Sequence, residues 1–233
     1  MRLIALFTGG KDSTLALDLA REAGHEVALL VTARSARRES WMFHTACIGV
    51  QHLQADAMGL QHRYVEVSGR KEDEVVELGV SLSALIKEFG ADGILSGGLA
   101  SHYQRRRLEW LAEKAGVRHV APCWGMRPRE LLLEVLRRGY YLVFVGVSAY
   151  GLGPEWLGRR LDYGSLEELD RLSERHGFNL AGEGGEYETL ITDAPFFKKA
   201  LRIKAEPVWL GDRGYLSISE ALLEPKLVSG NKP

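Results

Sequence analysis

The stretch from Thr8 to Thr14, Thr-Gly-Gly-Lys-Asp-Ser-Thr, decides the fold of this 233-residue chain. It follows an apolar run at residues 3–7 that is typical of a buried parallel strand. It precedes a helical pattern, in which Leu15, Leu19 and Ala23 are spaced at i, i+4 and i+8. The sequence therefore predicts a strand, a tight glycine turn and a helix in direct succession.

The glycine pair in this turn indicates a phosphate site. Gly9 and Gly10 can adopt positive φ angles and let the backbone approach a ligand closely. The helix that follows presents unpaired N–H groups and the positive end of its dipole, which favour phosphate. Lys11 adds a positive charge, and Ser13 and Thr14 add hydroxyl donors. The spacing excludes the P-loop of GTPases, which needs four residues between its first glycine and the Gly-Lys pair. An ordinary glycine-rich turn is the alternative, but the flanking strand and helix favour a nucleotide site.

The same stretch resembles the Ser-Gly-Gly-x-Asp-Ser loop of the PP-loop ATP pyrophosphatases, which cleave ATP between its α- and β-phosphates. Thr8 replaces the serine of that loop and keeps the hydroxyl. The resemblance implies that all seven residues from Thr8 to Thr14 bind ATP. Asp12 has the wrong sign to contact phosphate directly, so we expect it to bind Mg²⁺, directly or through water. Its alternative role is that of a first-turn carboxylate that stabilises the helix N-terminus.

The composition is that of an ordinary globular protein, with 45% apolar and 26% charged residues. A formal net charge of −1 argues against a nucleic-acid binder. No run approaches ~18 consecutive apolar residues and no signal-peptide pattern is present, so we expect a cytoplasmic protein without a membrane partner. Cys47 and Cys123 are too few for a disulfide framework or a cysteine zinc site, and we interpret them as reduced thiols.

The first half of the chain alternates short apolar runs with helical patterns, which predicts a parallel sheet flanked by helices. The expected strands are residues 3–7, 27–32, 63–67, 93–96 and 119–121, and the expected helices are residues 12–23, 46–58, 72–89, 101–115 and 129–138. Right-handed crossovers place the carboxyl ends of these strands at one edge, where ligands bind in an open α/β sheet.

From residue 140 the pattern changes. An apolar strand at residues 141–147 is followed by a helix at 166–176 and by short alternating runs between 200 and 223, which suggest a small antiparallel sheet. We therefore predict an α/β protein with an ATP-binding domain at residues 1–135 and a smaller, firmly packed α+β domain at residues 136–233.

A second motif, Gly-Glu-Gly-Gly-Glu-Tyr-Glu-Thr-Leu, occupies residues 182–190. Its carboxylates, Glu183, Glu186 and Glu188, are costly to hold together unless something positive neutralises them. They could bind a cation, orient an amine or act as a general base. Taken alone, the motif slightly favours a solvated acidic turn before a helix or strand.

The two motifs together resemble those of the diphthine–ammonia ligases, or diphthamide synthetases, a family of PP-loop ATP pyrophosphatases. Further segments share the resemblance: Phe43-His44, Ser101-x-Tyr103-Gln104-Arg105-x-Arg107-x-Glu109, Pro122-x-Trp124, Gly151-Leu152, Leu157-Gly158-Arg159, and Asp193-Ala194-Pro195 with Phe197. Cys123 departs from the apolar residue, usually Leu, that is expected at its position. The resemblance covers most of the chain and implies the adenine nucleotide alpha hydrolase-like PP-loop fold.

The resemblance also implies a reaction, the ATP-dependent amidation of the diphthine carboxylate on elongation factor 2. ATP converts the carboxylate into an acyl-adenylate and releases pyrophosphate, and ammonia then displaces AMP to leave diphthamide. No glutaminase signature is visible, so free ammonium is the expected nitrogen source. Lys11, Ser13 and the glycine N–H groups are expected to stabilise the charge on the leaving pyrophosphate. A homo-oligomer is possible.

Three further residues are candidate nucleotide contacts. Gly97 and Gly98 end the fourth expected strand at the ligand-binding edge, where a close approach to ribose or adenine is expected. His44 is a candidate contact to nucleotide or substrate, although a lone histidine in an apolar stretch is more often a packed one.

The helix at residues 101–115 opens with Tyr103, Arg105 and Arg107, which are candidate substrate-binding residues. One of the two arginines is expected to hold phosphate or the substrate carboxylate bidentately. The alternative is a solvated basic face that pairs with Glu109 and Glu113.

The acidic motif has two candidate roles in this reaction. Diphthine carries a trimethylammonium group, which aromatic faces and carboxylates bind. Tyr187 with Glu186 or Glu188 can supply both, and Gly184, Gly185 and Thr189 are expected to bind substrate beside them. In the second role, one of the glutamates binds ammonium and accepts its proton. Lys11, Asp12 and the three glutamates are therefore the candidate catalytic residues.

Two other functions compete with this interpretation. A PP-loop tRNA-modifying enzyme that adenylates a base is disfavoured by the neutral charge and by the lack of a Cys-x-x-Cys pair. The arginines at positions 34, 37, 38, 105, 106 and 107 support it if they form one basic face. A non-catalytic nucleotide sensor needs the glycines but has no evident use for Lys11-Asp12-Ser13 together with the acidic motif.

Overall fold

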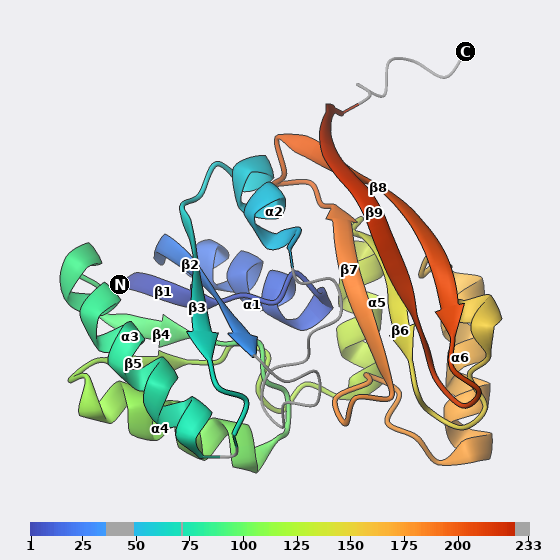
Figure 1. Ribbon diagram of the computed structural model, residues 1–233, viewed down its shortest axis with the longest axis horizontal. Coiled ribbons are helices and arrows are strands. Elements are labelled where there is room, and N and C mark those ends of the chain that lie inside the picture. The colour runs from blue at the N-terminus through green and yellow to red at the C-terminus, as the bar shows by residue number, and fades with distance from the viewer. Residues whose placement is uncertain (36–48, 71, 227–233) are drawn as a thin grey trace.

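The computed structural model describes residues 1–35, 49–70 and 72–226 (Figure 1). The N-terminal part contains β1 (Arg2–Leu6), α1 (Lys11–Glu22), β2 (Glu26–Ser35), α2 (Gln51–Met58), β3 (His62–Val67), α3 (Asp73–Phe89), β4 (Gly93–Leu95), α4 (His102–Lys114) and β5 (Arg118–Val120). The C-terminal part contains α5 (Pro128–Arg137), β6 (Tyr141–Val147), the short 3₁₀ helix η1 (Pro154–Trp156), α6 (Tyr163–His176), β7 (Tyr187–Asp193), β8 (Lys199–Trp209) and β9 (Gly214–Pro225).

The N-terminal part forms the predicted parallel sheet, with the strand order β3-β2-β1-β4-β5. Successive side chains of a strand point to opposite sides of its sheet, so the apolar residues of β1 are buried on both faces. Leu3, Ala5 and Phe7 pack in the cluster that contains α1, whereas Ile4 packs in the cluster that contains α3 and α4. The α/β fold prediction is confirmed, with the ends of most expected elements shifted by one or two residues.

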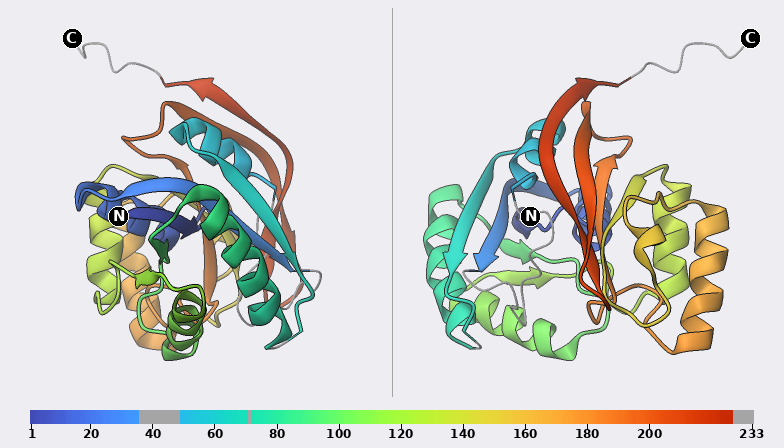
Figure 2. Two further views of the ribbon diagram at one scale, coloured as in Figure 1. Left: turned by 90° about the vertical axis from the view of Figure 1, so that its left-hand side faces the viewer. Right: turned by 45° about the vertical axis from the view of Figure 1, so that its right-hand side comes forward.

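The C-terminal part forms an antiparallel sheet with the strand order β7-β6-β9-β8. Helices α5 and α6 cover one face of this sheet (Figure 2), and Leu53 of α2 packs against apolar residues of the other face. On the covered face, Phe144 and Trp156 pack edge to face, with ring centroids 5.1 Å apart. The sequence indicated β6 and the strands of the tail, but β7 was not predicted.

The two parts share one hydrophobic core, in which Leu15 and Leu17 of α1 pack with Tyr187 and Ile191 of β7. A polar network reinforces this junction, because Arg138 binds Asp18 and Glu22 of α1 as well as Glu134 of α5. The parts are therefore packed firmly together.

The predicted domain boundary at residues 135/136 falls inside α5 and stays a prediction. Helix α5 itself packs on α6, where Arg129 forms ion pairs with Glu167 and Asp170.

Among the described residues, no helix combines the length and the apolar character that a membrane crossing requires.

Candidate active site

A cleft opens at the carboxyl ends of the parallel strands, beside β7. One wall comes from the N-terminal part and the other from the acidic motif, so the cleft brings together two motifs about 175 residues apart. Its lining includes Phe7, Thr8, Gly10, Lys11, Asp12, Ser13, Val31, Thr32, Ala33, Ser96, Gly97, Gly98, Gln104, Arg105, His119, Trp124, Glu183, Tyr187, Glu188 and Thr189.

Two glutamines of α2 hold the loop that leads into α1. Gln51 Nε2 donates to the Thr8 carbonyl oxygen at 2.9 Å, and Gln54 Nε2 donates to the Gly9 carbonyl oxygen at 2.9 Å. A Cβ atom at Gly9 would lie only 2.1 Å from Gln54 Oε1, and Gly9 has a φ angle of +82°. Glycine is therefore required at this position. Sequence reasoning missed both glutamines, because their role depends on how α2 packs against a distant loop.

The hydroxyl groups of the loop have different positions. Thr8 Oγ1 and Ser13 Oγ lie 3.1 Å apart at the floor of the cleft, and the Gly10 N–H donates to Thr8 Oγ1 at 3.4 Å. Thr14 is fully buried and lies outside the cleft lining. Thr8 and Ser13 are thus placed to face a phosphate, whereas Thr14 contributes to the packing of α1.

Lys11 is held in a buried position where the two sheets meet, with 3% of its side chain exposed. Its Nζ donates to Asp12 Oδ2 at 3.0 Å and lies 5.0 Å from the centroid of the Tyr187 ring. Its backbone N–H donates to Thr189 Oγ1 at 3.2 Å, which joins the start of α1 to β7. The lysine is therefore fixed before any ligand binds, with its positive charge at the cleft.

Asp12 has the features of a cation ligand. Burial raises the pKa of its carboxyl group, and the adjacent Lys11 ammonium opposes that rise. The Oδ1 atom is buried and has no hydrogen-bond partner in the described part of the chain. A buried carboxylate oxygen without a donor is satisfied by a cation, and Mg²⁺ at nucleotide sites is bound by one or two carboxylates plus phosphate oxygens and water. Asp12 thus fits the expected Mg²⁺ role.

Two glutamates of the acidic motif, Glu183 and Glu186, are held by backbone N–H groups. Glu183 Oε1 accepts hydrogen bonds from the N–H groups of Leu99, Ala100 and Ser101, at 3.1, 2.7 and 2.9 Å. These residues immediately precede α4, so the carboxylate lies at the positive end of that helix dipole. Glu183 therefore connects the motif to the N-terminal part.

Glu186 closes its own loop. Its carboxylate oxygens accept from the Asn179 N–H at 3.1 Å and from the Gly184 N–H at 2.7 Å. Gly185 is part of the same turn, since its carbonyl oxygen accepts from Ser148 Oγ at 2.5 Å. Of the three glutamates, Glu183 and Glu188 line the cleft and Glu186 does not.

Tyr187 lies inside the molecule, with 2% of its side chain exposed. Its hydroxyl donates to the Leu180 carbonyl oxygen at 2.7 Å, and its ring packs edge to face on Phe144. Burial raises the pKa of the phenol well above its usual value, so the hydroxyl stays protonated. The Lys11 ammonium lies over this ring. A contact between Tyr187 and a trimethylammonium group stays a prediction.

Gly97 and Gly98 differ in their surroundings although both line the cleft. A Cβ atom at Gly97 would lie 2.6 Å from the Asp12 carbonyl carbon and from the Ser13 nitrogen, whereas a Cβ at Gly98 would meet no atom within 4 Å. Gly97 therefore lets the end of β4 approach the first turn of α1, and Gly98 leaves open space in the cleft.

The structure separates the two arginines of α4. Arg105 lines the cleft, with its guanidinium 4.3 Å from the Trp124 ring centroid and its Nε donating to Glu109 Oε1 at 2.6 Å. Arg107 instead pairs with Glu72 outside the cleft, and its guanidinium stacks on Tyr103. Arg105 is thus placed to contact a ligand in the cleft, while Tyr103 and Arg107 connect α4 to the start of α3.

The family model described as the diphthamide synthase N-terminal domain matches residues 1–119, and the diphthamide synthase C-terminal domain matches residues 127–223. The chain belongs to the diphthamide synthase family. The resemblance of the sequence to this family is thereby confirmed.

Relatives from several eukaryotes match over most of this family member. A protein named diphthine–ammonia ligase from Danio rerio is 34% identical, over 88% of this chain and 87% of that protein. Its namesake from Homo sapiens is 31% identical, over 98% of this chain and 95% of that protein. Among solved structures, a predicted subunit of a tRNA methyltransferase from Methanocaldococcus jannaschii has a TM-score of 0.45 at 15% identity, covering 84% of this chain and 98% of that one.

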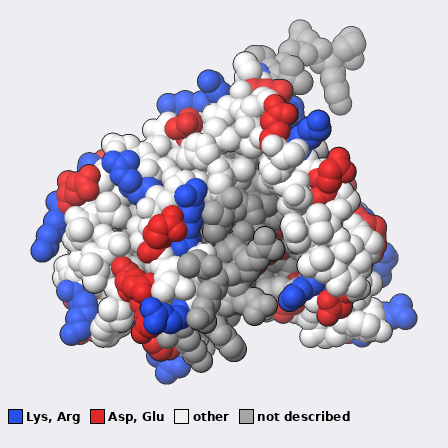
Figure 3. Space-filling view, viewed as in Figure 1, with Lys and Arg blue, Asp and Glu red and all other residues white. Residues whose placement is uncertain are grey.

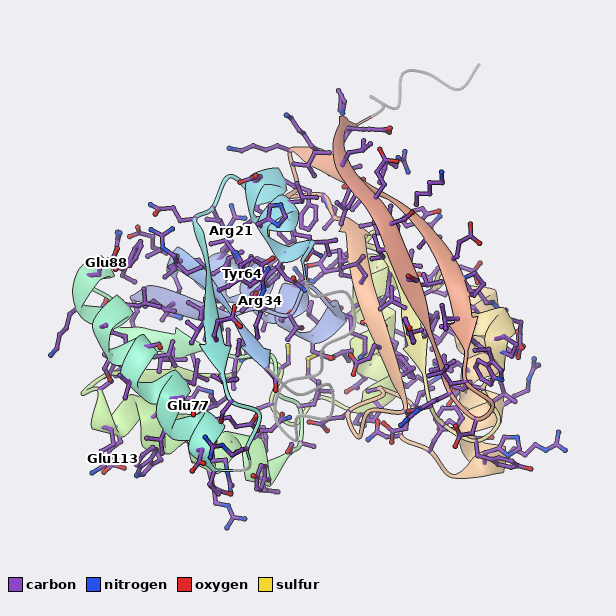
Figure 4. The ribbon with its side chains drawn as sticks, in the orientation of Figure 1. Arg21, Arg34, Tyr64, Glu77, Glu88 and Glu113 are labelled. Carbon is purple, nitrogen blue, oxygen red and sulfur yellow. The ribbon has the colours of Figure 1, made fainter. Side chains whose placement is uncertain are left out.

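Several arginines were candidates for a basic face in a tRNA-modifying enzyme. Those that the structure describes contact other residues of the same chain. Arg34 stacks on Tyr64, 3.3 Å from its ring centroid (Figure 4), and also faces Glu66. Arg106 Nε donates to the His102 carbonyl oxygen at 3.3 Å. Arg37, Arg38 and the candidate contact His44 lie outside the described residues. Figure 3 shows Lys and Arg interspersed with Asp and Glu over one face of the molecule.

Sequence reasoning also missed the pair formed by Ser96 and His119. Ser96 follows β4 and His119 lies in β5, and Ser96 Oγ is 2.8 Å from His119 Nε2 inside the cleft lining. The parallel pairing of Ile94 with His119 brings these side chains to one face. No short motif marks the pair, since it arises from the register between two strands.

Proposed function

We propose that this member of the diphthamide synthase family amidates the diphthine carboxylate on elongation factor 2 with ammonium. The reaction uses ATP, proceeds through an acyl-adenylate and releases pyrophosphate and AMP. The shared cleft carries the proposal, because the glycine loop with its buried Lys11 faces residues of the acidic motif across it. The name of the relatives, diphthine–ammonia ligase, supports the substrate and the nitrogen source.

The N-terminal wall supplies what ATP requires. In this proposal the pyrophosphate leaves against the amide groups of the glycine loop, Ser13 and Lys11, because preorganised donors of this kind stabilise developing charge. The apolar side chains of Phe7, Val31 and Ala33 line the cleft near β1 and β2 and suit an aromatic base. Mg²⁺ held by Asp12 supplies further neutralisation of phosphate charge when bound.

The opposite end of the cleft suits the carboxylate to be activated. Sheet order places β4 and β5 on the far side of β1 from β2, and Arg105 lies at that end. A guanidinium can bind a carboxylate through two parallel hydrogen bonds and orient it toward the α-phosphate. Arg105 is therefore our candidate for the residue that positions the acyl group.

Exchange between ATP and radiolabelled pyrophosphate tests this proposal. With diphthine-bearing elongation factor 2 and no ammonium, reversible adenylation gives exchange that depends on the factor. Lys11→Met should reduce the exchange by about 100-fold or more, because it removes the fixed charge at the pyrophosphate. Lys87→Met, at an exposed lysine of α3, is the matched control. Wild-type protein without factor-dependent exchange would contradict the proposal. Cytoplasmic location and assembly into a homo-oligomer stay predictions.

A further inference from the structure

An open groove on the outer side of β5 joins the cleft. It follows α4 from Glu113, at the outer end of this helix (Figure 4), to Arg105 and Trp124. His119 and Ala121 line both the groove and the cleft. Because β5 and β2 lie on opposite sides of β1 and β4 in the sheet, the groove reaches the cleft at the end away from β2. That end is where the acyl group is placed in the proposed function.

The groove suits the passage of a small cation. The carboxylates of Glu109 and Glu113 and the guanidinium groups of Arg105 and Arg118 line it in equal number. Glu109 is paired with Arg105, so no net charge accumulates that would retain a cation or exclude it. Ammonium therefore meets carboxylates and an aromatic side chain along this path without being trapped.

His119 stands where the groove and the cleft meet. Its Nε2 lies 2.8 Å from Ser96 Oγ, and a hydrogen bond from Nε2–H to that oxygen leaves the Nδ1 lone pair to accept a proton. Burial lowers the pKa of the imidazole; Glu109 opposes this shift and Arg105 adds to it, both from α4. The ring is therefore neutral at neutral pH, as a proton acceptor must be.

The other candidate bases of the cleft are less suited to ammonium. Glu183 is held by backbone N–H groups, and Asp12 is bound to Lys11. Glu186 is also held by backbone N–H groups and lies outside the cleft lining. Glu188 also lines the cleft, but it lies on β7 and is absent from the groove lining. Only a base at the groove mouth can meet ammonium on arrival.

We propose that ammonium enters through this groove and that His119 takes a proton from it before the nitrogen attacks the activated acyl carbon. The assignment rests on the proposed function. His119 Nδ1 accepts one proton from ammonium, and the freed lone pair of ammonia forms the C–N bond. The C–O bond to the AMP phosphate breaks, and its electron pair leaves with AMP. The nitrogen then loses a second proton to water, and His119 returns its proton to solvent.

Hydroxylamine separates this role from a structural one, because it is uncharged at neutral pH and needs no prior deprotonation. His119→Gln keeps a side-chain partner for Ser96 but cannot take up a proton. With diphthine-bearing elongation factor 2 and ATP at pH 7, we expect this variant to lose amide formation with ammonium by about 100-fold or more. Hydroxamate formation with hydroxylamine and ATP–pyrophosphate exchange should stay within about twofold of wild type. The amidation deficit should shrink as the pH rises, because solution then supplies free ammonia.

His52→Gln, at an exposed histidine outside the cleft lining, is the control and should match wild type in every assay. A His119→Gln variant that amidates normally would overturn the assignment, and so would one that loses hydroxamate and amide in parallel. An ammonium-specific loss in Glu188→Gln with none in His119→Gln would overturn it in favour of the acidic motif. Wild-type protein that forms neither amide nor hydroxamate would contradict the proposed function itself.

Discussion

At the scale of single residues, neighbouring positions of like chemistry have different tasks. Arg105 and Arg107 are two positions apart on α4, and residues at that spacing lie on opposite sides of a helix. The sequence therefore predicts that only one of them faces the cleft. Which one it is depends on how α4 packs against β5 and α3, and the structure assigns that position to Arg105. The glutamates of the acidic motif are separated in the same way by the turns of their loop.

Substitutions of Glu183 distinguish a structural role of this carboxylate from a role in the chemical reaction. Glu183→Ala removes the acceptor of three N–H groups at the start of α4, and we expect it to lower the free energy of unfolding by about 2–3 kcal/mol. Glu183→Gln keeps an acceptor oxygen and should cost about 1 kcal/mol while retaining most ATP–pyrophosphate exchange. Urea denaturation and the exchange assay measure both quantities, with Glu174→Gln at an exposed site of α6 as control. A Glu183→Gln protein with normal stability and no exchange would show instead that the carboxylate acts in the chemistry.

His62 makes stability depend on pH. Thr32 Oγ1 donates to the Phe7 carbonyl oxygen at 2.6 Å and so accepts from His62 Nε2 at 2.8 Å. Burial, with the nearby His52 and Arg34, lowers the pKa of His62 from 6.5 to about 4. Between these pH values His62 is protonated in the unfolded chain and neutral in the folded chain. The contribution of neutral His62 to the stability of the fold is therefore fully present above pH 6.5 and is lost as the pH falls toward 4.

Between pH 7 and pH 5, wild type should accordingly lose about 1–2 kcal/mol more unfolding free energy than His62→Gln, after allowance for solvent at the ring. Urea titrations of both proteins at the two pH values measure this difference. Equal losses of unfolding free energy in the two proteins would show that His62 titrates alike in the folded and unfolded states.

At the scale of elements, local patterns predict the N-terminal half well because each element there has its own hydrophobic period. Strand β7 has none: it begins within the acidic motif at Tyr187, pairs with β6, and is buried on both faces. Tyr187 and Ile191 pack in the core with α1, and Leu190 packs in a second cluster. Its residues read as strand only once these two neighbours are known. Gln51 and Gln54 escaped prediction for the same reason, since glutamines on a short helix gain their role from the loop that they hold.

The junction of β4 with α1 can be tested through a glycine pair. Gly97→Ala places a methyl group 2.6 Å from the backbone of Asp12 and Ser13 and must displace the first turn of α1. We expect a loss of about 1–3 kcal/mol in unfolding free energy, the usual range for overpacking. Gly98→Ala is the matched control, because its methyl group meets no atom within 4 Å, and it should change stability by no more than about 0.5 kcal/mol. Equal stability of the two variants in urea would contradict the close approach.

At the scale of the whole molecule, the two sheets form one folding unit because a single hydrophobic core contains α1, β6 and β7. Unfolding followed by far-ultraviolet circular dichroism and by tryptophan fluorescence should give coincident transitions in urea. Arg138→Met removes the partner of Asp18 and Glu22 and should lower both midpoints together. Two separate transitions, in wild type or in this variant, would show that the parts fold independently.

The proposed function requires that one cleft activates a carboxylate with ATP and passes it to ammonia. The most direct measurement is the mass of diphthine-bearing elongation factor 2 after incubation with the protein, ATP, Mg²⁺ and ammonium. The account predicts the mass decrease that replacing a carboxyl hydroxyl with an amino group requires, together with AMP and pyrophosphate in equal amounts and no change when ATP or ammonium is omitted. An unchanged mass with ATP bound to the protein, or ADP and phosphate as the products, would contradict it.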